Sequence, residues 1–139
     1  MTRIVLDTNI LVSALLQPLG PSAQIFLFCI AGSIQLCVSG NIYAEYEEVI
    51  SRPRLKRGDE VIAGTLQTIR EKGLWVRPTQ AVNICIDPDD NIFLECAEAA
   101  RANYLVTGNL KHFPTKWGAT RVVTPRWLLD TLLAERSGG

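Results

Sequence analysis

Five short runs of apolar residues, rich in Ile, Leu and Val, alternate with segments of helical pattern, and this alternation limits the fold more than any other feature of the sequence. Such runs, bounded by polar residues, Gly or Pro, are typical of buried strands. A chain in which strands and helices alternate favours a mainly parallel sheet with helices on both faces. We therefore predict an α/β fold with strands at 3–6, 33–39, 74–78, 103–109 and 120–125.

Proline, glycine and capping residues indicate where the helices between these strands begin and end. A helix that is apolar on nearly all sides is predicted at 9–16, and a second begins at Pro21. A third, capped by Asn41, ends before Pro53 because the residue before a proline disfavours helix. Further helices are predicted to end at Lys72, where Gly73 follows, and to cover 87–102 and 125–135.

Length, composition and charge narrow the class of protein. The 139 residues, 47% of them apolar, suit one domain, residues 1–139, with a sizeable core. No apolar run reaches the roughly 18–20 residues that span a bilayer, and Asp7 and Asn9 interrupt any signal-peptide core, so no membrane association is expected and the cytoplasm is the expected compartment. The formal net charge is zero, so any contact with nucleic acid must come from a local patch.

The cysteines do not indicate a metal site. They are scattered singly along the chain, and His112 is the only histidine, so a zinc site with its short ligand spacings is not favoured. Reduced cysteines acting as small core residues are expected instead at Cys29, Cys37, Cys85 and Cys96.

An aspartate interrupts the apolar stretch "IVLDTNILVSALL" just after the first predicted strand. Ligands of parallel α/β sheets bind at the carboxyl ends of the strands, near a switch in strand order. Asp7 and Asn109 are both expected at that edge. Asp7 could equally cap the helix that follows, with Thr8 or Asn9 sharing the role, so this residue alone does not identify a site.

Two further segments place acids beside predicted apolar faces. Glu45 falls at the edge of the apolar stripe of its helix, where an unpaired charge is costly, although a half-exposed flank position explains it too. Asp90 falls on the core-facing side of the predicted 87–102 helix, but Asp89 does as well, so helix phase does not separate them. Asp87 can cap this helix, and the helix dipole favours acids in the first turn. Capping nevertheless explains only one of the three acids Asp87, Asp89 and Asp90.

Taken together, the three segments predict a metal site. Carboxylates that converge repel one another unless a cation neutralises them, and oxygen-rich sites suit Mg²⁺ or Mn²⁺. Such an ion can activate water and stabilise the charge that develops in a phosphodiester displacement. No G-x-S-x-G, P-loop or G-x-G-x-x-G motif offers a competing catalytic set.

Four blocks in order resemble the PIN domain family, and are similar to the VapC-type toxins of bacterial and archaeal toxin–antitoxin systems. The blocks are "IVLDTNILVSALL", "VSGNIYAEYEEVISRPR", "DPDDNIFLECAEAARANYLVTGN" and "LKHF", which together extend over nearly the whole chain. The resemblance implies a three-layer α/β/α sandwich around a mainly parallel sheet of about five strands. It also implies a metal-dependent ribonuclease.

Residue by residue, the resemblance implies that Asp7, Glu45 and Asp90 are the metal ligands. The family's D-x-x-[apolar]-x-x-x-A helix pattern, completed by Ala97, selects Asp90 over Asp89. The predicted metal-binding set is therefore Asp7, Glu45 and Asp90.

Other polar positions are expected to complete the catalytic site. Thr107 and Asn109 match the family's T-x-[DN] element, but many relatives carry a fourth Asp at position 109, and the uncharged Asn should weaken a second metal site. We expect Asn109 to be catalytic together with the three acids. Asn9, Ser39 and Thr107 are expected to support the ligands, with helix capping as the alternative for Asn9.

A basic run follows the helix of Glu45 and lies between two predicted helices. It fits salt-sensitive contact with RNA phosphates, a solvated turn, or, as the resemblance implies, contact with an antitoxin or a second copy in a homodimer. Lys111, His112 and Lys116 could also approach phosphates, although His112 is expected to be structural rather than a general base. The residues predicted to bind RNA are Arg52, Arg54, Lys56, Arg57 and Lys111.

The sequence thus predicts a Mg²⁺- or Mn²⁺-dependent endoribonuclease, the toxin component of a toxin–antitoxin pair. One alternative is a PIN fold that only binds RNA or protein, which Asn109 leaves open. A less favoured alternative is a phosphohydrolase acting through an aspartyl phosphate, as in haloacid dehalogenases. That chemistry needs a second Asp two residues after Asp7, where this chain has Asn9.

Overall fold

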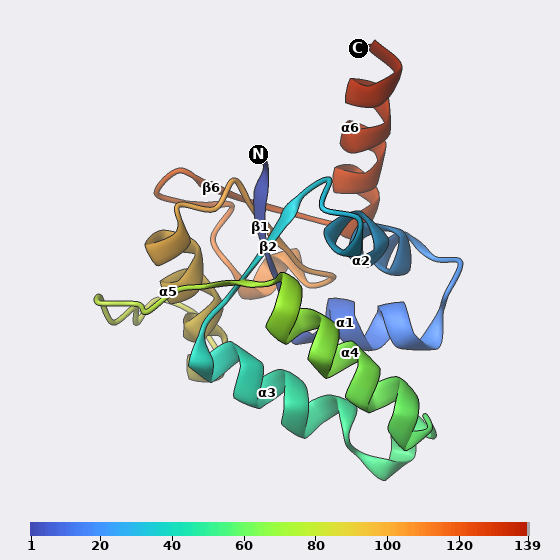
Figure 1. Cartoon of the computed structure of the whole chain (residues 1–139). Coiled ribbons are helices and arrows are strands. Elements are labelled where there is room, and N and C mark those ends of the chain that lie inside the picture. The colour runs from blue at the N-terminus through green and yellow to red at the C-terminus, as the bar shows by residue number, and fades with distance from the viewer. Residues whose placement is uncertain (139) are drawn as a thin grey trace.

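The computed structural model, which describes residues 1–138, has a central six-stranded sheet flanked by helices (Figure 1). Five strands run parallel in the order β3-β2-β1-β4-β6, and β5 pairs antiparallel with β6 at one edge. The predicted α/β class is confirmed, and the predicted domain end at residue 139 lies outside the described residues. The strands are β1 Arg3–Leu6, β2 Gln35–Val38, β3 Leu74–Trp75, β4 Tyr104–Val106, β5 Lys116–Trp117 and β6 Thr120–Val123.

The sheet has one strand more than the five predicted. The additional strand, β5, is only two residues long and is joined to β6 by a turn in which Gly118 has φ of 58°. A two-residue strand carries no apolar run or alternation that could reveal it in the sequence. The predicted third strand at 74–78 is likewise shorter, because only Leu74–Trp75 pairs with β2.

The helices lie close to the predicted segments. They are α1 Thr8–Leu16, α2 Pro21–Ile30, α3 Gly40–Ile50, α4 Asp59–Lys72, α5 Asn91–Ala100 and α6 Pro125–Gly138, with short 3₁₀ helices η1 Pro53–Leu55, η2 Pro88–Asp90 and η3 Leu110–His112.

Two predicted helix starts are wrong in detail. The cap of α3 is Ser39 rather than Asn41, because the Ser39 Oγ accepts a hydrogen bond from the backbone N–H of Ile42 at 3.3 Å. The α-helix predicted from residue 87 begins at Asn91, since Pro88–Asp90 forms a 3₁₀ turn capped by the side chain of Asp87.

Helices cover both faces of the sheet, as predicted. Helix α5 packs against β1, β2 and β4, whereas α1, α2 and α6 pack on one another and lie on the other side (Figure 1). The three-layer α/β/α arrangement is therefore confirmed. The inner strands are covered on both sides over most of their length: residues 4–6, 36–38 and 105–106 are 0–2% exposed. All four cysteines are free, and Cys85 alone among them is not buried.

The order of the strands reverses beside β1. From β1 the chain forms β2 and then β3 on one side, and later returns to form β4 on the other side. Parallel α/β sheets bind ligands in the crevice at the carboxyl ends of strands at such a switch point. The residues that follow β1 and β4 are Asp7 and Thr107.

Among residues 1–138, no single helix is both long and apolar enough to cross a membrane. Helices α1 and α2 meet these criteria only as a pair, and a bend of 102° separates them.

Candidate active site

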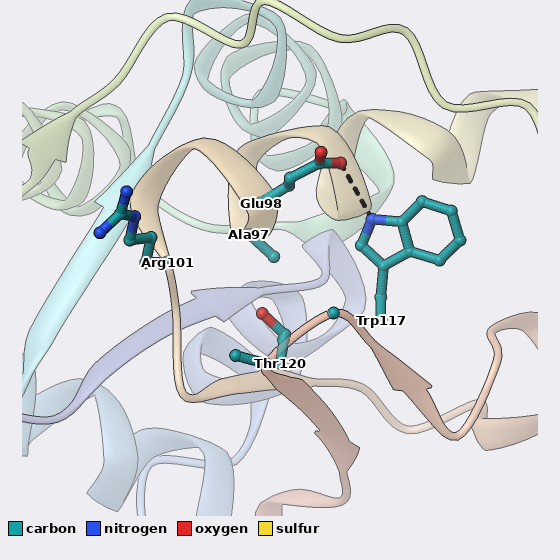
Figure 2. Close-up of a pocket in the computed structure, with 7 residues that line it drawn as sticks. Ala97, Glu98, Arg101, Trp117 and Thr120 are labelled. Atoms are coloured by element: carbon teal, nitrogen blue, oxygen red, sulfur yellow. Dashed lines mark hydrogen bonds between the residues drawn. The ribbon is translucent and has the colours of Figure 1, made fainter.

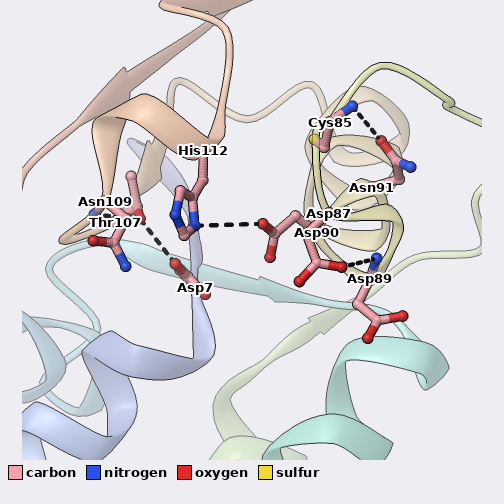
Figure 3. Close-up of polar contacts among 9 residues, drawn as sticks. All are labelled: Asp7, Cys85, Asp87, Asp89, Asp90, Asn91, Thr107, Asn109 and His112. Atoms are coloured by element: carbon pink, nitrogen blue, oxygen red, sulfur yellow. Dashed lines mark hydrogen bonds and ion pairs between the residues drawn. The ribbon is translucent and has the colours of Figure 1, made fainter.

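Asp7 and Thr107 join the two strands at the switch point. The backbone N–H of Asp7 donates to the carbonyl of Val106 at 3.0 Å, which continues the β1–β4 ladder by one residue. The Thr107 hydroxyl then donates to Oδ2 of Asp7 at 2.8 Å (Figure 3). Both side chains are buried. The position and orientation of the Asp7 carboxylate are thus determined by two parallel strands and one side-chain hydrogen bond.

Asp7 does not act as a helix cap. It occupies the N-cap position of α1, yet its side chain makes no capping hydrogen bond. Burial raises the pKa of the Asp7 carboxyl above its usual value, while the hydrogen bond from Thr107 and the nearby backbone amides of Asn9 and Thr8 act to lower it. The side-chain hydrogen bond of Asp7 therefore goes to Thr107 at the end of β4 and not to the first turn of α1.

Glu45 reaches the same region from α3 and is half-buried. Its Oε2 accepts a hydrogen bond from the hydroxyl of Thr8, which is 5% exposed. Burial raises the pKa of Glu45; the bond from Thr8 lowers it, and the charges of Asp7 and Asp89 raise it further. The sequence pointed to Thr8 only as a capping residue, so its contact with Glu45 was missed.

Asp90 carries a buried oxygen without a hydrogen-bond donor. Among the described residues its Oδ2 has no hydrogen-bond partner, and His112 Nδ1 lies 3.7 Å away, too far for a hydrogen bond (Figure 3). Burial first, and then the charges of Asp7 and Asp87, raise the pKa of Asp90 to about 6, whereas His112 lowers it. A buried carboxylate oxygen left in this state is costly unless a proton or a cation satisfies it.

These side chains line one cleft. Its acidic residues are the three predicted ligands together with Asp87 and Asp89, and the lining also contains Arg52 and Arg54 with Val12, Val49 and Leu55. The acids come from the end of β1, from α3 and from the η2 turn before α5. The fold therefore brings together carboxylates that are 38 and 83 residues from Asp7 in the sequence.

The remaining predicted site residues lie at different distances from the cleft. Asn9 lines it and is exposed, whereas Ser39 is buried and caps α3. Asn109 is exposed and outside the cleft lining, and its backbone N–H donates to the Thr107 hydroxyl at 3.0 Å. Lys111 is also exposed and does not line the cleft.

The basic run divides into two pairs. Arg52 and Arg54 line the cleft, but Lys56 and Arg57 do not. Lys56 has φ of 52°, the left-handed conformation that turns the chain after η1. Arg57 Nε donates to the carbonyl of Leu15 at 3.2 Å, so this side chain ties the turn to the end of α1.

The cleft fits a divalent cation chemically but does not hold a complete ligand set in its present geometry. Its lining is rich in carboxylate oxygens, which Mg²⁺ and Mn²⁺ prefer, and one of them is buried without a partner. Within residues 1–138, however, no three His, Cys, Asp or Glu side chains lie close enough together to hold one ion. Glu45 is held by Thr8 and Asp7 by Thr107, so binding one ion through all three acids requires side chains to move closer.

Asn91 also shapes this site, and the sequence did not indicate it. It is buried, and its Oδ1 accepts a hydrogen bond from the backbone N–H of Ile84 at 3.2 Å. The same oxygen accepts one from the backbone N–H of Cys85 at 3.0 Å (Figure 3). These bonds hold the segment before the acidic turn against α5, directly beside Asp90. Its partners lie in irregular structure, which no periodicity could predict.

A second cavity lies at the opposite end of α5. It is formed by Ala97, Glu98 and Arg101 from that helix and its C-terminal cap, and by Trp117–Thr120 of the β5–β6 hairpin (Figure 2). The Trp117 indole N–H donates to Oε2 of Glu98 at 3.1 Å. None of the predicted site residues lines this cavity.

An α/β/α fold with an acidic cleft at the switch point of a parallel sheet is the arrangement that the sequence motifs implied. The sequence matches the PIN domain family over residues 3–111, and the chain belongs to that family. The uncharacterized protein MJ1680 of Methanocaldococcus jannaschii is 27% identical over 110 residues, which are 77% of this chain and 70% of that protein.

A similar fold is found in a chain of the crystal structure of VapBC2 from Rickettsia felis bound to a DNA fragment from their promoter. The two folds align with a TM-score of 0.56 over 88% of this chain and 98% of that chain. The sequence identity is 18%, so this likeness shows the fold.

Proposed function

We propose that this chain is a Mg²⁺- or Mn²⁺-dependent endoribonuclease that acts in the cytoplasm as the toxin of a toxin–antitoxin pair. Membership of the PIN domain family supports a nuclease. The likeness to the fold of a VapBC2 chain supports the toxin role and an antitoxin partner.

One observation carries the nuclease proposal. Asp7, Glu45 and Asp90 come from three distant segments, line one cleft, and all have a raised pKa, while Asp90 leaves a buried oxygen without a partner. Structural acids are normally paired with cations or exposed to water. A cleft that concentrates unpaired carboxylates instead is typical of a functional site.

The three acids share one role in the proposed site, and neighbouring polar residues support them. Asp7, Glu45 and Asp90 would hold the cation, which when bound can activate water and stabilise charge on the phosphate. Thr107 holds Asp7 in place and Thr8 holds Glu45. Asn9 lies exposed in the cleft, where it can hydrogen-bond water or substrate. Asn109 contributes through its backbone amide, which orients the Thr107 hydroxyl.

RNA cleavage by the purified protein tests the proposal, with a labelled single-stranded RNA and either Mg²⁺ or Mn²⁺. We expect Asp7→Asn, Glu45→Gln and Asp90→Asn each to lower the rate by roughly 10²-fold or more, since each removes a charged ligand. Glu47→Gln is the matched control, because Glu47 is an exposed acid on the same helix as Glu45 and lies outside the cleft lining. A chelator should abolish cleavage.

Full activity of Asp7→Asn or Asp90→Asn, or cleavage that survives the chelator, contradicts the proposal. A protein that binds RNA or a partner protein but cleaves nothing supports the binding module instead. That second function is favoured by the uncharged Asn109 and by the incomplete ligand geometry of the cleft.

The partner proposal has a separate test. An antitoxin is expected to be encoded beside this chain, and co-expression of the two should give a complex whose RNA cleavage is suppressed. Size-exclusion chromatography of the isolated chain tests the proposed homodimer. Absence of any stable complex with the neighbouring gene product would contradict the toxin role while leaving the nuclease proposal intact.

A further inference from the structure

The cleft lining carries both signs of charge, and its cations point to how a substrate strand lies in it. Five carboxylates form its acidic part, and two arginines share the lining, Arg52 just after α3 and Arg54 on η1. A nucleic-acid strand carries a negative charge at every phosphate, so it is repelled by the acidic part wherever no cation intervenes. Within the cleft lining, a neighbouring phosphate therefore finds a favourable partner at the arginines.

The two arginines are not equivalent. Arg52 pairs with Glu48 through two hydrogen bonds, from Nε at 3.2 Å and Nη2 at 2.8 Å, so its guanidinium already has a carboxylate partner one helical turn away. Arg54 is exposed, and it makes no hydrogen bond or ion pair with any residue from 1 to 138. It is thus the one uncommitted cation among the cleft-lining residues that the structure describes.

The backbone around Arg54 is well suited to present it there. The side chain stands on η1, whose first residue, Pro53, has a fixed φ. Arg57 then ties the same turn to α1 through the carbonyl of Leu15. A guanidinium on a restrained turn can form two parallel hydrogen bonds to a phosphate, which the ammonium of Lys cannot match.

We propose that Arg54 binds a phosphate of the substrate strand adjacent to the one that reacts at the acidic part of the cleft. This inference rests on the proposed nuclease function. It makes Arg54 a substrate-positioning residue and implies that the site takes an oligonucleotide in preference to an isolated phosphodiester. Lys56 and Arg57, in the same basic turn, are assigned no phosphate contact.

Steady-state cleavage of a short single-stranded RNA tests the assignment. We expect Arg54→Gln to raise KM roughly tenfold, with a smaller change in kcat. The slope of log KM against log salt concentration should also fall by about one, which corresponds to the loss of one phosphate contact. Arg54→Lys should recover part of the loss. Lys72→Gln is the control, because it removes an exposed charge at the end of α4, outside the cleft lining, and should change KM less than twofold.

A minimal diester, bis(p-nitrophenyl) phosphate, supplies the second arm. It has no adjacent phosphate, so the loss caused by Arg54→Gln should be at least roughly fivefold smaller on this compound than on the RNA. An equal loss on both substrates overturns the inference, because Arg54 would then act at the reacting phosphate. Equal effects of Arg54→Gln and Lys72→Gln on RNA overturn it as well.

Binding separates this inference from the proposed function. The affinity for the same RNA, measured by fluorescence anisotropy with Ca²⁺ as the only divalent cation, should fall roughly tenfold in Arg54→Gln and less than twofold in Lys72→Gln. If the protein binds RNA in this pattern but never cleaves it, the nuclease proposal fails and the Arg54 contact stands. If cleavage is observed but Arg54→Gln binds RNA as tightly as the unsubstituted protein, the proposed Arg54 contact is wrong and the nuclease proposal stands.

Discussion

The hydroxyl of Thr107 donates a hydrogen bond of 2.8 Å to the carboxylate of Asp7, joining residues 100 positions apart in the sequence at the carboxyl ends of two adjacent parallel strands. The same hydroxyl oxygen accepts the backbone N–H of Asn109 at 3.0 Å. Thr107 thus fixes one oxygen of Asp7 and leaves the rest of the carboxylate to face the cleft.

Thr107→Val keeps the shape of the side chain and removes the donor. The pKa of Asp7, already raised by burial, should rise further, and the carboxylate should lose its fixed orientation. We expect cleavage at limiting Mn²⁺ to fall by about 10–100-fold, as for other groups that orient metal ligands. The measurement is the rate as a function of Mn²⁺ concentration. Thr107→Ser retains the donor and should stay near the original rate; equal losses in both variants would contradict the assignment.

Asp90→Asn should make the protein more stable and less active. The Asp90 carboxyl has a pKa of about 6 in the folded chain, against a usual value of 3.8. Between pH 3.8 and about 6, folding therefore takes up a proton at this residue. Its contribution therefore favours the folded state at low pH and is lost as the pH rises through about 6. At pH 7.5 in chelator, Asp90→Asn should raise the free energy of unfolding by on the order of 1–3 kcal/mol.

Denaturant unfolding at pH 5 and pH 7.5 measures this difference. The gain from Asp90→Asn should shrink toward pH 5, whereas Asp89→Asn, at the exposed neighbouring acid, should give little change at either pH. A destabilised Asp90→Asn at pH 7.5 would show that Asp90 is satisfied in the folded chain by a group other than a cation.

Tyr46→Phe should weaken the connection between α3 and β1. The Tyr46 hydroxyl, on a side chain 1% exposed, donates to the carbonyl of Leu6 at 2.6 Å, next to Asp7. Removing this donor leaves a buried carbonyl unpaired and should cost about 1–2 kcal/mol of unfolding free energy. Tyr43→Phe, whose hydroxyl meets the exposed Arg70, is the control and should cost less. Equal costs would mean that burial of the Leu6 carbonyl is unimportant.

Asn91→Ala should release the segment that precedes the acidic turn. Two backbone N–H groups, of Ile84 and Cys85, lose their acceptor, at a cost of about 2 kcal/mol. Hydrogen exchange at these two amides should accelerate, and RNA cleavage should fall because Asp90 loses its support. Asn83→Ala, at an exposed neighbouring position, should change neither. Unchanged exchange in Asn91→Ala would rule out the proposed anchoring role.

The strand and helix pattern predicted most of the fold, because period and punctuation are local properties. Pro21 and Gly73 mark helix ends as expected, and at Gly73 an added Cβ would lie only 2.6 Å from the carbonyl oxygen of Ile69. The errors also have local causes. At α3, Ser39 and Asn41 are both good caps, and the structure uses Ser39. The strand β5 is too short to carry a pattern.

The candidate site was less predictable, since it depends on side chains that meet across the fold. Helix phase placed Glu45 near the core and family spacing selected Asp90, but neither could show that Thr8 bonds Glu45 or that Asp90 lacks a donor. From the sequence, the basic residues that line the cleft could not be distinguished from those that do not. Only the path of the chain around Lys56 separates Arg54, in the cleft, from Arg57, bound to α1.

By itself the sequence determined that strands and helices alternate and that a carboxylate follows the first strand, because these depend on apolar periodicity and on the order of residues. The tertiary structure decided which carboxylates share a cleft, which hydroxyl holds each of them, and which arginine remains uncommitted. These are contacts between segments up to 100 residues apart. Burial and distance control their energies, and both exist only once the sheet has formed.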